Sequence, residues 1–266
     1  MERFRHGPGN GLRRRVVEHP SGYGAIVSIV KPAGERSLWQ ELGTAARRMA
    51  VPVVLIGTVV VLLGLLVTRV LDGTDVADAD SWLDRWLAGH RTSTGATLTH
   101  LGTLFGETPT IVGLTAVTAV IFRVVFHRWR ESVLLVLCVT AQSLIFLVTT
   151  ILIDRKRPPV PHLDDSPPTS SFPSGHTSAA TAFYLGTALI VAWHTRHVWL
   201  RWLLVVLGVL VPIVVATCRM YRGMHYPTDV LTSFLLGLSL LAVATRLLPL
   251  SERDRPSAPS LVARRR

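Results

Sequence analysis

Six long apolar runs, each close to the length of a membrane-spanning helix, constrain this chain more than any other feature of its sequence. A helix needs about 20 mainly apolar residues to cross the hydrocarbon core of a bilayer. The chain is 49% hydrophobic and has a mean hydropathy of +0.40, which is typical of a polytopic membrane protein. We therefore predict an all-α membrane protein with six transmembrane helices in a bundle. The predicted spans are Met49–Leu71, Pro109–Phe126, Ser132–Ile153, Thr177–Trp193, Val198–Thr217 and Asp229–Leu248.

The charged residues predict the orientation of these spans. The formal net charge of +11 would suit a nucleic-acid-binding protein, but the basic residues cluster between apolar runs and only 7% of residues are aromatic. Basic clusters precede the first span, follow the last, and separate the second from the third and the fourth from the fifth. The positive-inside rule makes the face that they share cytoplasmic. We therefore expect a multi-pass plasma-membrane protein with both termini in the cytoplasm and no nucleic-acid partner.

The polar stretches at the two ends divide the chain into three parts. Residues 1–48 are polar and basic, and we expect a largely disordered cytoplasmic tail there without a cleavable signal peptide. Residues 49–250 form the predicted membrane domain, and residues 251–266 form a second basic cytoplasmic tail. The two cysteines, Cys138 and Cys218, lie in or beside apolar runs, so a disulfide scaffold is not expected.

A short amphipathic helix is predicted on the outer face, over Asp80–His90. Its apolar residues recur at helical spacing and are Trp82, Leu83, Trp86 and Leu87. This pattern fits a helix that lies in the membrane interface, and it fits equally a helix that packs on the end of the bundle. The sequence leaves both interpretations open.

Some basic residues fall on the outer face, against the positive-inside rule. Cations misplaced near a membrane are costly and usually serve a function. The alternative is that they anchor the protein by snorkelling to the interface. These residues are Arg155, Lys156, Arg157, Arg219 and Arg222.

Two short motifs on that face are suited to binding a phosphate group. Arg157, directly before Pro158, carries a planar guanidinium that can hold two phosphate oxygens, and Lys156 adds a further cation. Ser174 and Gly175 precede the fourth span, where serine is a common N-cap residue and glycine lets the backbone approach an anion. The N–H groups and the dipole of a helix start favour a phosphate at this point.

Two histidines and a carboxylate supply groups that could break a phosphate ester. His225 is followed four residues later by Asp229, which can hydrogen-bond one ring nitrogen and raise the nucleophilicity of the other. His176, at the start of the fourth span, would donate a proton to the leaving oxygen. Arg219 would clamp the phosphate together with Arg157. These roles describe attack by His225 on phosphorus, a phosphohistidine intermediate, and its hydrolysis by water.

These motifs resemble those of the membrane-bound type-2 phosphatidic acid phosphatase superfamily, the lipid phosphate phosphatases. The family motifs are Lys-x6-Arg-Pro, Pro-Ser-Gly-His and Ser-Arg-x5-His-x3-Asp. The second matches residues 173–176, the third matches residues 219–229, and the first keeps its Arg-Pro end at residues 157–158. The resemblance covers roughly residues 80–248. It implies metal-independent hydrolysis of a lipid phosphate or diphosphate at the outer face, no cofactor, and the residue roles given above. Implied substrates are polyprenyl diphosphates such as undecaprenyl diphosphate, phosphatidic acid and phosphatidylglycerol phosphate.

Two positions depart from the family pattern. Thr150 stands where the family has its lysine, seven positions before Arg157 (157 − 7 = 150), and its hydroxyl offers a neutral donor instead of a charge. Losing a cation from such a site costs about 1.5–3 kcal/mol of anion stabilisation. Lys156 or Arg155 could take over the role of that lysine. Cys218 stands where the family usually has serine.

Other functions are consistent with parts of the pattern. Loss of the lysine suggests a lipid-phosphate binder or transporter without activity, although binding alone needs no set of two histidines and an aspartate. A phosphotransferase would share the intermediate and use another acceptor. A serine hydrolase through Ser174 would need a Gly-x-Ser-x-Gly motif, which is absent. A metal hydrolase would gather histidines and aspartates that lack compact ligand spacing: His162, Asp164, Asp165, His176, His225 and Asp229.

Overall fold

The computed structural model describes residues 14–16, 27–29, 37–165 and 169–248. The chain divides into two compact units, Met1–Ser37 and Leu38–Arg266. In the first unit, β1 (Arg14–Val16) pairs antiparallel with β2 (Val27–Ile29). This short hairpin lies within the stretch that we predicted to be a largely disordered tail. The rest of residues 1–36 and the predicted tail at 251–266 lie outside the described residues.

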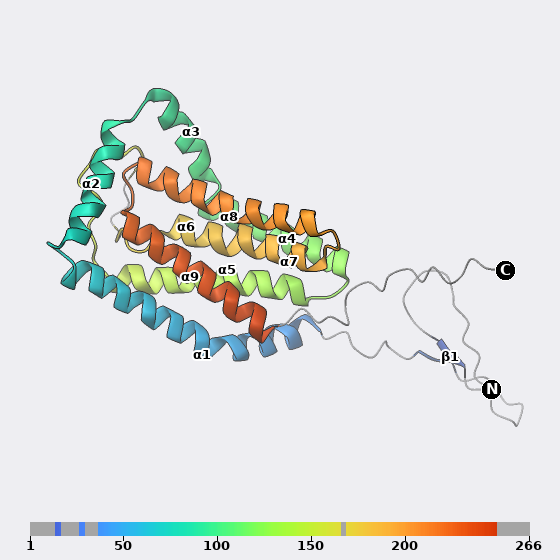
Figure 1. Ribbon diagram of the computed structural model, residues 1–266. Coiled ribbons are helices and arrows are strands. Elements are labelled where there is room, and N and C mark those ends of the chain that lie inside the picture. Colours follow the sequence, from blue (N-terminus) through green and yellow to red (C-terminus); the bar gives the residue numbers. More distant parts are fainter. Residues whose placement is uncertain (1–13, 17–26, 30–36, 166–168, 249–266) are drawn as a thin grey trace, which may run out of the picture. The chain divides into compact units, whose positions relative to one another are not determined.

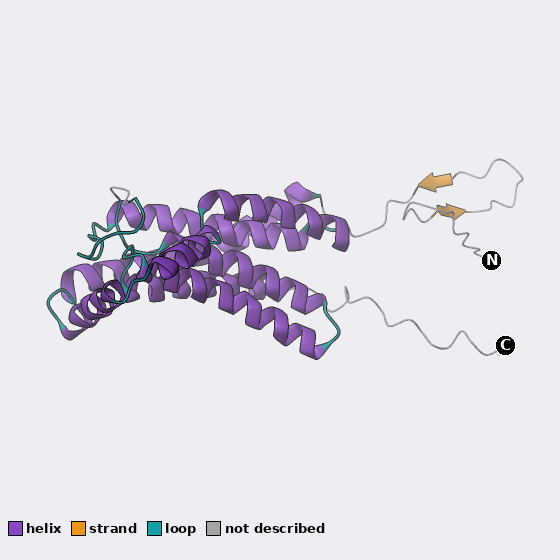
Figure 2. Cartoon of the chain, turned by 90° about the horizontal axis from the view of Figure 1, so that it is seen from above, coloured by secondary structure: helices purple, strands orange, loops and turns teal. Residues whose placement is uncertain are grey.

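In its described part, the second unit contains helices alone, which confirms the all-α class predicted for the membrane domain (Figures 1 and 2). In chain order the elements are α1 (Leu38–Leu65), the π-helical turn η1 (Leu66–Val70), α2 (Asp75–Gly89), α3 (Ser93–Leu104), α4 (Thr108–Phe126), α5 (Arg130–Leu152), α6 (Gly175–Ala180), the π-helical turn η2 (Thr181–Leu185), α7 (Gly186–His194), α8 (Val198–Tyr221) and α9 (Pro227–Leu247).

Five helices of the described chain are long and apolar enough to cross a membrane, namely α1 with η1, α4, α5, α8 and α9. They correspond to the first, second, third, fifth and sixth predicted spans. The first helix begins at Leu38 rather than at Met49, and the added turns are amphipathic, with Ala45 buried in the core. The multi-pass membrane character predicted from the sequence is therefore confirmed.

The predicted fourth span falls on a continuous helical segment, α6–η2–α7, that is not among these five. Its first half is rich in small and hydroxyl-bearing residues, and Thr177, Ser178 and Thr181 are buried. This segment contacts α4, α5, α8 and α9. A helix covered by its neighbours needs less apolar surface than one that faces lipid. That it spans the membrane stays a prediction.

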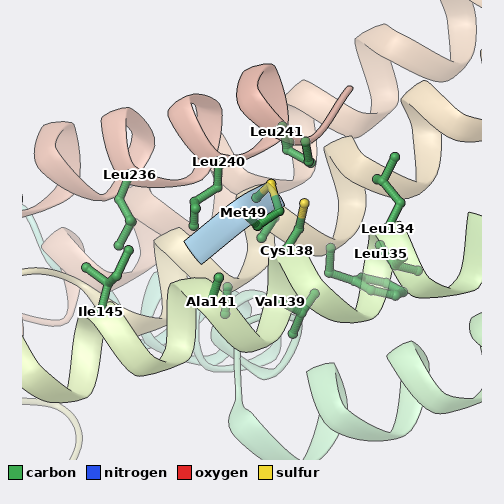
Figure 3. Close-up of a cluster of buried hydrophobic side chains, with 14 of the residues drawn as sticks. Met49, Leu134, Leu135, Cys138, Val139, Ala141, Ile145, Leu236, Leu240 and Leu241 are labelled. Carbon is green, nitrogen blue, oxygen red and sulfur yellow. The ribbon is translucent and has the colours of Figure 1, made fainter. Parts of the chain in front are cut away.

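Part of the apolar core, which also reaches α4 and the α6–η2–α7 segment, lies between α1, α5 and α9 (Figure 3). Met49 of α1, Leu134 and Cys138 of α5, and Leu236 and Leu240 of α9 are all buried there. In a membrane, such close packing of side chains is itself a main source of helix association, because lipid tails are as apolar as leucine. This packing holds α5 and α9 in a fixed position along each other, and so determines where the end of α5 and the start of α9 lie.

Helix α2 packs on the end of the bundle with its acidic face inward. Asp80 and Asp84 are only 3% and 1% exposed, whereas Trp82 and Trp86 are 60% and 47% exposed. The helix contacts α8 and α9. Of the two interpretations left open by the sequence, packing on the bundle end is therefore observed. A position of the outward tryptophans in the membrane interface stays a prediction.

Helix α3 was not predicted, and small residues bring it against α8. A Cβ atom at Gly102 would lie 2.4 Å from Sγ of Cys218, and one at Gly95 would lie 2.3 Å from the hydroxyl of Tyr221. Glycine therefore permits a helix contact that no other residue allows without a shift. The contact places Thr103, at the end of α3, beside Arg219 of α8.

The packing of α8 on the η2–α7 segment can be tested at Gly208. A Cβ atom there would lie 2.6 Å from Cβ of Ala188 and 3.2 Å from backbone atoms of Tyr184 and Leu185, which cannot move independently. We expect Gly208→Ala to lower the free energy of unfolding in detergent by about 1–3 kcal/mol. Gly113→Ala in α4, where no atom lies within 4 Å, is the matched control and should leave stability nearly unchanged. Equal losses in both variants would contradict this packing.

Candidate active site

Three segments that are far apart in the sequence meet at one end of the bundle, the left end in Figure 1. They are the loop after α5, the start of α6, and the turn between α8 and α9 with the first residues of α9. Hydrogen bonds join them: Ser171 of the loop contacts His225 of the turn, and the backbone of Ser174 contacts Asp229. All the site residues predicted from the sequence are carried by these segments or by the adjoining end of α8.

His225 has a tautomer that is fixed by the protein backbone. Its Nδ1 lies 2.7 Å from the carbonyl oxygen of Ser171. A carbonyl oxygen can only accept, so Nδ1 must carry the proton and donate it, which leaves a free lone pair on Nε2. Nδ1 lies 3.7 Å from Oδ2 of Asp229, which is too far for a hydrogen bond. The hydrogen bond that we expected Asp229 to make is therefore made by Ser171, and Asp229 acts on His225 through its charge.

Asp229 is fully buried at the start of α9 and both of its carboxylate oxygens are held. Oδ2 accepts a hydrogen bond from the backbone N–H of Tyr226 at 3.0 Å, as expected of an acidic residue that caps a helix start behind Pro227. Oδ1 accepts from the guanidinium of Arg155. Burial lowers the pKa of His225 from its usual range, against the opposing charge of Asp229. His225 is therefore neutral at neutral pH, as a nucleophile must be.

Two arginines, the buried Arg219 and the half-buried Arg157, present unused donors at the site. Nη1 of Arg219 donates to Oδ2 of Asp164 at 2.8 Å and to the hydroxyl of Thr103 at 3.2 Å. Nη1 of Arg157 donates to the carbonyl oxygen of Met224 at 2.7 Å. The Nε–H group of each arginine is buried and has no partner in the described part of the chain. Buried donors without partners are rare, and two of them near a neutral histidine mark a place for an anion.

Asp164 pairs with both arginines at the end of α8 and offsets part of their charge. Besides Arg219, it accepts from Nε and Nη2 of Arg222 at 2.8 and 2.5 Å. Burial opposes ionisation, but the hydrogen bonds of Arg222 and the charge of Arg219 hold the pKa of Asp164 below its usual value. Arg222 also donates to the carbonyl oxygens of Ala96 and Leu163 at 2.9 and 2.7 Å, so it joins α3 to the loop. Sequence analysis considered Asp164 only as a metal ligand and missed this role.

Ser174 and Gly175 shape the start of α6. Ser174 is the N-cap residue, as its type predicts, but its hydroxyl bonds the hydroxyl of Thr177 at 3.0 Å instead of a backbone N–H group. A Cβ atom at Gly175 would lie 2.9 Å from the ring of Phe146 in α5. Glycine is therefore needed here for the close approach of two helices, in addition to any role in anion binding.

His176 lies one residue further on, within electrostatic range of His225, Arg219, Arg157 and Asp164. A Cβ atom at Gly106 would lie 2.9 Å from its Cβ and 3.1 Å from its carbonyl oxygen, so the residues after α3 hold its backbone. Its ring forms no hydrogen bond with any described residue. It is therefore free to exchange a proton with a bound group.

Two residues of the first motif lie differently from the others. The Lys156 side chain is exposed and lines a separate polar pocket of about 360 Å³ with Asp72 and Tyr226, and the structure does not bring it together with Arg219. The hydroxyl of Thr150 is buried and has no hydrogen-bond partner in the described chain. Thr150 follows Phe146 by one helical turn, so it faces the start of α6.

The described residues include no group of three or more His, Cys, Asp or Glu side chains placed to hold a metal ion. Two of the candidate ligands have other partners. His162 contacts the carbonyl oxygen of Pro158 at 3.0 Å, and Asp164 pairs with Arg219 and Arg222.

Comparison with known families shows which family this chain belongs to. The family model described as the PAP2 superfamily matches residues 113–253, which is more than half of the chain. The chain belongs to the PAP2 superfamily. This confirms the resemblance inferred from the motifs, and with it the predicted enzyme class, that of phosphatases acting on lipid phosphates.

Individual relatives share sequence and fold with this chain. Phosphatidylglycerophosphatase B of Bacillus subtilis is 29% identical over 164 residues, which cover 60% of this chain and 72% of that protein. The crystal structure of a PAP2-type phosphatidylglycerolphosphate phosphatase from Bacillus subtilis superposes with a TM-score of 0.64 at 22% identity, covering 71% of this chain and 94% of that chain. For the crystal structure of Aquifex aeolicus LpxE the TM-score is 0.50 at 20% identity, with 63% and 95% covered. These structures show the shared fold.

Asp84 lies near the site, and its burial indicates that the free energy of unfolding depends on pH. Both of its carboxyl oxygens are buried without partners in the described chain, and burial with the nearby charges of Asp80 and Asp229 raises its pKa from 3.8 to about 8. The folded state then binds this proton more tightly than the unfolded state does, so its contribution to stability is lost as the pH rises from about 4 to about 8. We expect Asp84→Asn to flatten the decline of the melting temperature over this range.

The exposed Asp78 of the same helix supplies the control, because Asp78→Asn should leave the pH dependence of the wild type unchanged. Melting temperatures in detergent at successive pH values make the comparison. Parallel curves for the wild type and Asp84→Asn would show that Asp84 is ionised in the folded protein.

Proposed function

We propose that this protein hydrolyses a phosphomonoester of a membrane lipid, without a metal and through a phosphohistidine intermediate, and that phosphatidylglycerol phosphate is the first substrate to test. The main support is a buried histidine, His225, with its lone pair on Nε2. Near it lie two arginines whose Nε–H groups have no partner in the described chain. The choice of substrate is supported by the phosphatidylglycerophosphate phosphatase from Bacillus subtilis, which is similar to this chain in sequence and in fold. Polyprenyl diphosphates and phosphatidic acid are the alternatives to compare.

In the first step, Nε2 of His225 attacks phosphorus and the bond from phosphorus to the lipid oxygen breaks. His176 donates a proton to that oxygen, and the lipid alcohol leaves. Arg157 and Arg219 stabilise the charge that spreads over the remaining phosphate oxygens. The negative charge of Asp229, 3.7 Å from Nδ1, stabilises the positive charge that His225 gains.

In the second step, water attacks the phosphohistidine. His176, now neutral, accepts a proton from that water, and the bond between phosphorus and Nε2 breaks. The products are inorganic phosphate and a neutral His225. Because Arg219 is paired with Asp164 at 2.8 Å, the phosphate group competes with this carboxylate for the guanidinium in both steps.

The proposed topology has six spans with α6–η2–α7 as the fourth, the site at the outer face and both termini in the cytoplasm. The alternation of basic clusters along the sequence supports this orientation. The basic segments at both ends would then face anionic lipids of the inner leaflet.

The function can be tested by phosphate release from purified protein in detergent with EDTA present. We expect release from phosphatidylglycerol phosphate, and a loss of at least about a thousandfold in His225→Ala, because the nucleophile is removed. His197→Ala, at an exposed histidine at the start of α8, is the matched control and should keep full activity. Full activity in His225→Ala would refute the mechanism, and release abolished by EDTA would indicate a metal enzyme.

Thr150 motivates the second candidate, a binder that holds a lipid phosphate with little turnover. The site has one cation fewer than the family motif, and the hydroxyl in its place has no partner in the described chain. We expect Thr150→Lys to leave phosphate release equal or higher, by up to about tenfold if the added charge contributes about 1.4 kcal/mol to the transition state. The measurement is kcat/KM for the lipid substrate. A sharp loss would show that the pocket is adapted to threonine.

A further inference from the structure

Arg155, which the proposed mechanism does not use, is bound to two carboxylates from different helices. Its guanidinium donates to Oδ1 of Asp229 and, through Nη2, to Oδ2 of Asp80 at 2.9 Å. Nη1 also donates to the hydroxyl of Thr228 at 2.8 Å. The guanidinium lies 4.2 Å above the ring of Tyr226. The whole head group of Arg155 is therefore fixed, and so is the carboxylate of Asp229 that it holds.

The backbone of Arg155 fixes a second neighbour of His225. Its carbonyl oxygen accepts from the N–H group of Ser171 at 2.9 Å, and its own N–H donates to the hydroxyl of Ser170 at 3.3 Å. The carbonyl of Ser171, held in this way, accepts the proton of His225 Nδ1. Arg155 thus reaches both oxygen groups that face Nδ1, one through its backbone and one through its side chain.

Asp80 holds Arg155 from the side of α2. Its carboxylate is almost completely buried and also accepts from the backbone N–H of Thr228 at 3.2 Å and from its hydroxyl at 2.5 Å. Asp80, Arg155, Thr228 and Asp229 therefore form one closed network across α2, the loop after α5 and the start of α9. A buried ion network of this kind keeps its geometry only while every member is paired.

We propose that Arg155 and Asp80 are positioning residues that hold Asp229 and the Ser171 carbonyl against Nδ1 of His225, so that helix α2 governs the reactivity of the nucleophile. Neither residue contacts the reacting atoms, because both act on the side of the ring opposite Nε2. The effect on turnover rests on the proposed function, whereas the effect on the ionisation of His225 does not.

The charges around His225 give this proposal a directional test. Asp80 offsets the charge of Arg155, and Arg155 offsets the charge of Asp229. Removing the charge of Asp80 leaves Arg155 free to screen Asp229, so the pKa of His225 should fall. Removing the charge of Arg155 leaves Asp229 unscreened, so the pKa of His225 should rise. The charged and titratable groups near the His225–Asp229 pair are Asp80 and Asp84 of α2, Arg155 and Arg157 of the loop, His176 of α6, Arg219 of α8 and Tyr226 before α9.

The experiment compares Asp80→Asn and Arg155→Gln with the wild type and with Asp78→Asn, an exposed aspartate of the same helix. Deuterium exchange at C2 of His225, followed by mass spectrometry of the peptide across a pH series, gives its pKa without any turnover. We expect a lower pKa in Asp80→Asn, a higher pKa in Arg155→Gln and no change in Asp78→Asn. In the phosphate-release assay, kcat should fall about tenfold to a hundredfold in both test variants, with KM changed less than about twofold.

Folding of each variant is checked by its melting temperature and its elution in size-exclusion chromatography. If a charge variant does not fold, Thr228→Val replaces it in the test. This substitution keeps the side-chain shape and removes only the hydroxyl between Asp80 and Arg155. We expect its kcat to fall severalfold. An unchanged pKa of His225 in the folded variants, or shifts in the same direction, would overturn the proposal. Opposite shifts in a protein that releases no phosphate would support the positioning role and refute the proposed function.

Discussion

One hydrogen bond, from Nδ1 of His225 to the carbonyl oxygen of Ser171, decides which ring nitrogen of His225 keeps a free lone pair. A side-chain carboxylate could rotate or take a proton, but a backbone carbonyl in a held loop can do neither. In the loop after α5, Arg155 near the start pairs with Ser171 near the end, and this pairing presents the Ser171 carbonyl to the turn before α9. The packing of the long helices brings the end of α5, the end of α8 and the start of α9 together at the same end of the bundle.

The site consists of two ion clusters with His225 between them. On one side, Arg155 joins Asp80 to Asp229 in a network whose charges are all paired. On the other, Arg219 and Arg222 share Asp164, and two guanidinium N–H groups in the site find no partner among the described residues. Buried charges are tolerated only with such partners. In the first cluster every charged group has a partner, so the cluster holds side chains in position. In the second cluster some donors have no partner among the described residues, so the cluster is suited to binding a ligand.

The long helices and the candidate histidine and aspartate could be predicted from the sequence, whereas several of their tertiary partners could not. Apolar runs located the five long apolar helices, and the spacing of His225 and Asp229 placed the proposed nucleophile beside a carboxylate, because both signals are local. Ser171 acts through its backbone, which has no sequence signature. Asp80 and Asp84 alternate with Trp82 and Trp86 as in any amphipathic helix. In a membrane protein, however, the apolar face of such a helix can point away from the protein interior. The periodicity therefore does not say which face is buried. Asp164 meets its arginines only through the tertiary fold.

Asp164 also has a consequence for anion binding at the site. A cluster of arginines without a counter-ion would repel itself and would attract any small anion from the surroundings. With a tethered carboxylate in place, part of this positive charge is offset and both Arg219 and Arg222 are held before a substrate arrives. Substrate binding is then an exchange of one oxyanion for another, and a singly charged ion such as chloride has little to gain by it. In the proposed function, the same tether would return to the arginines as phosphate departs, so a pocket built for strong anion binding could still release its product.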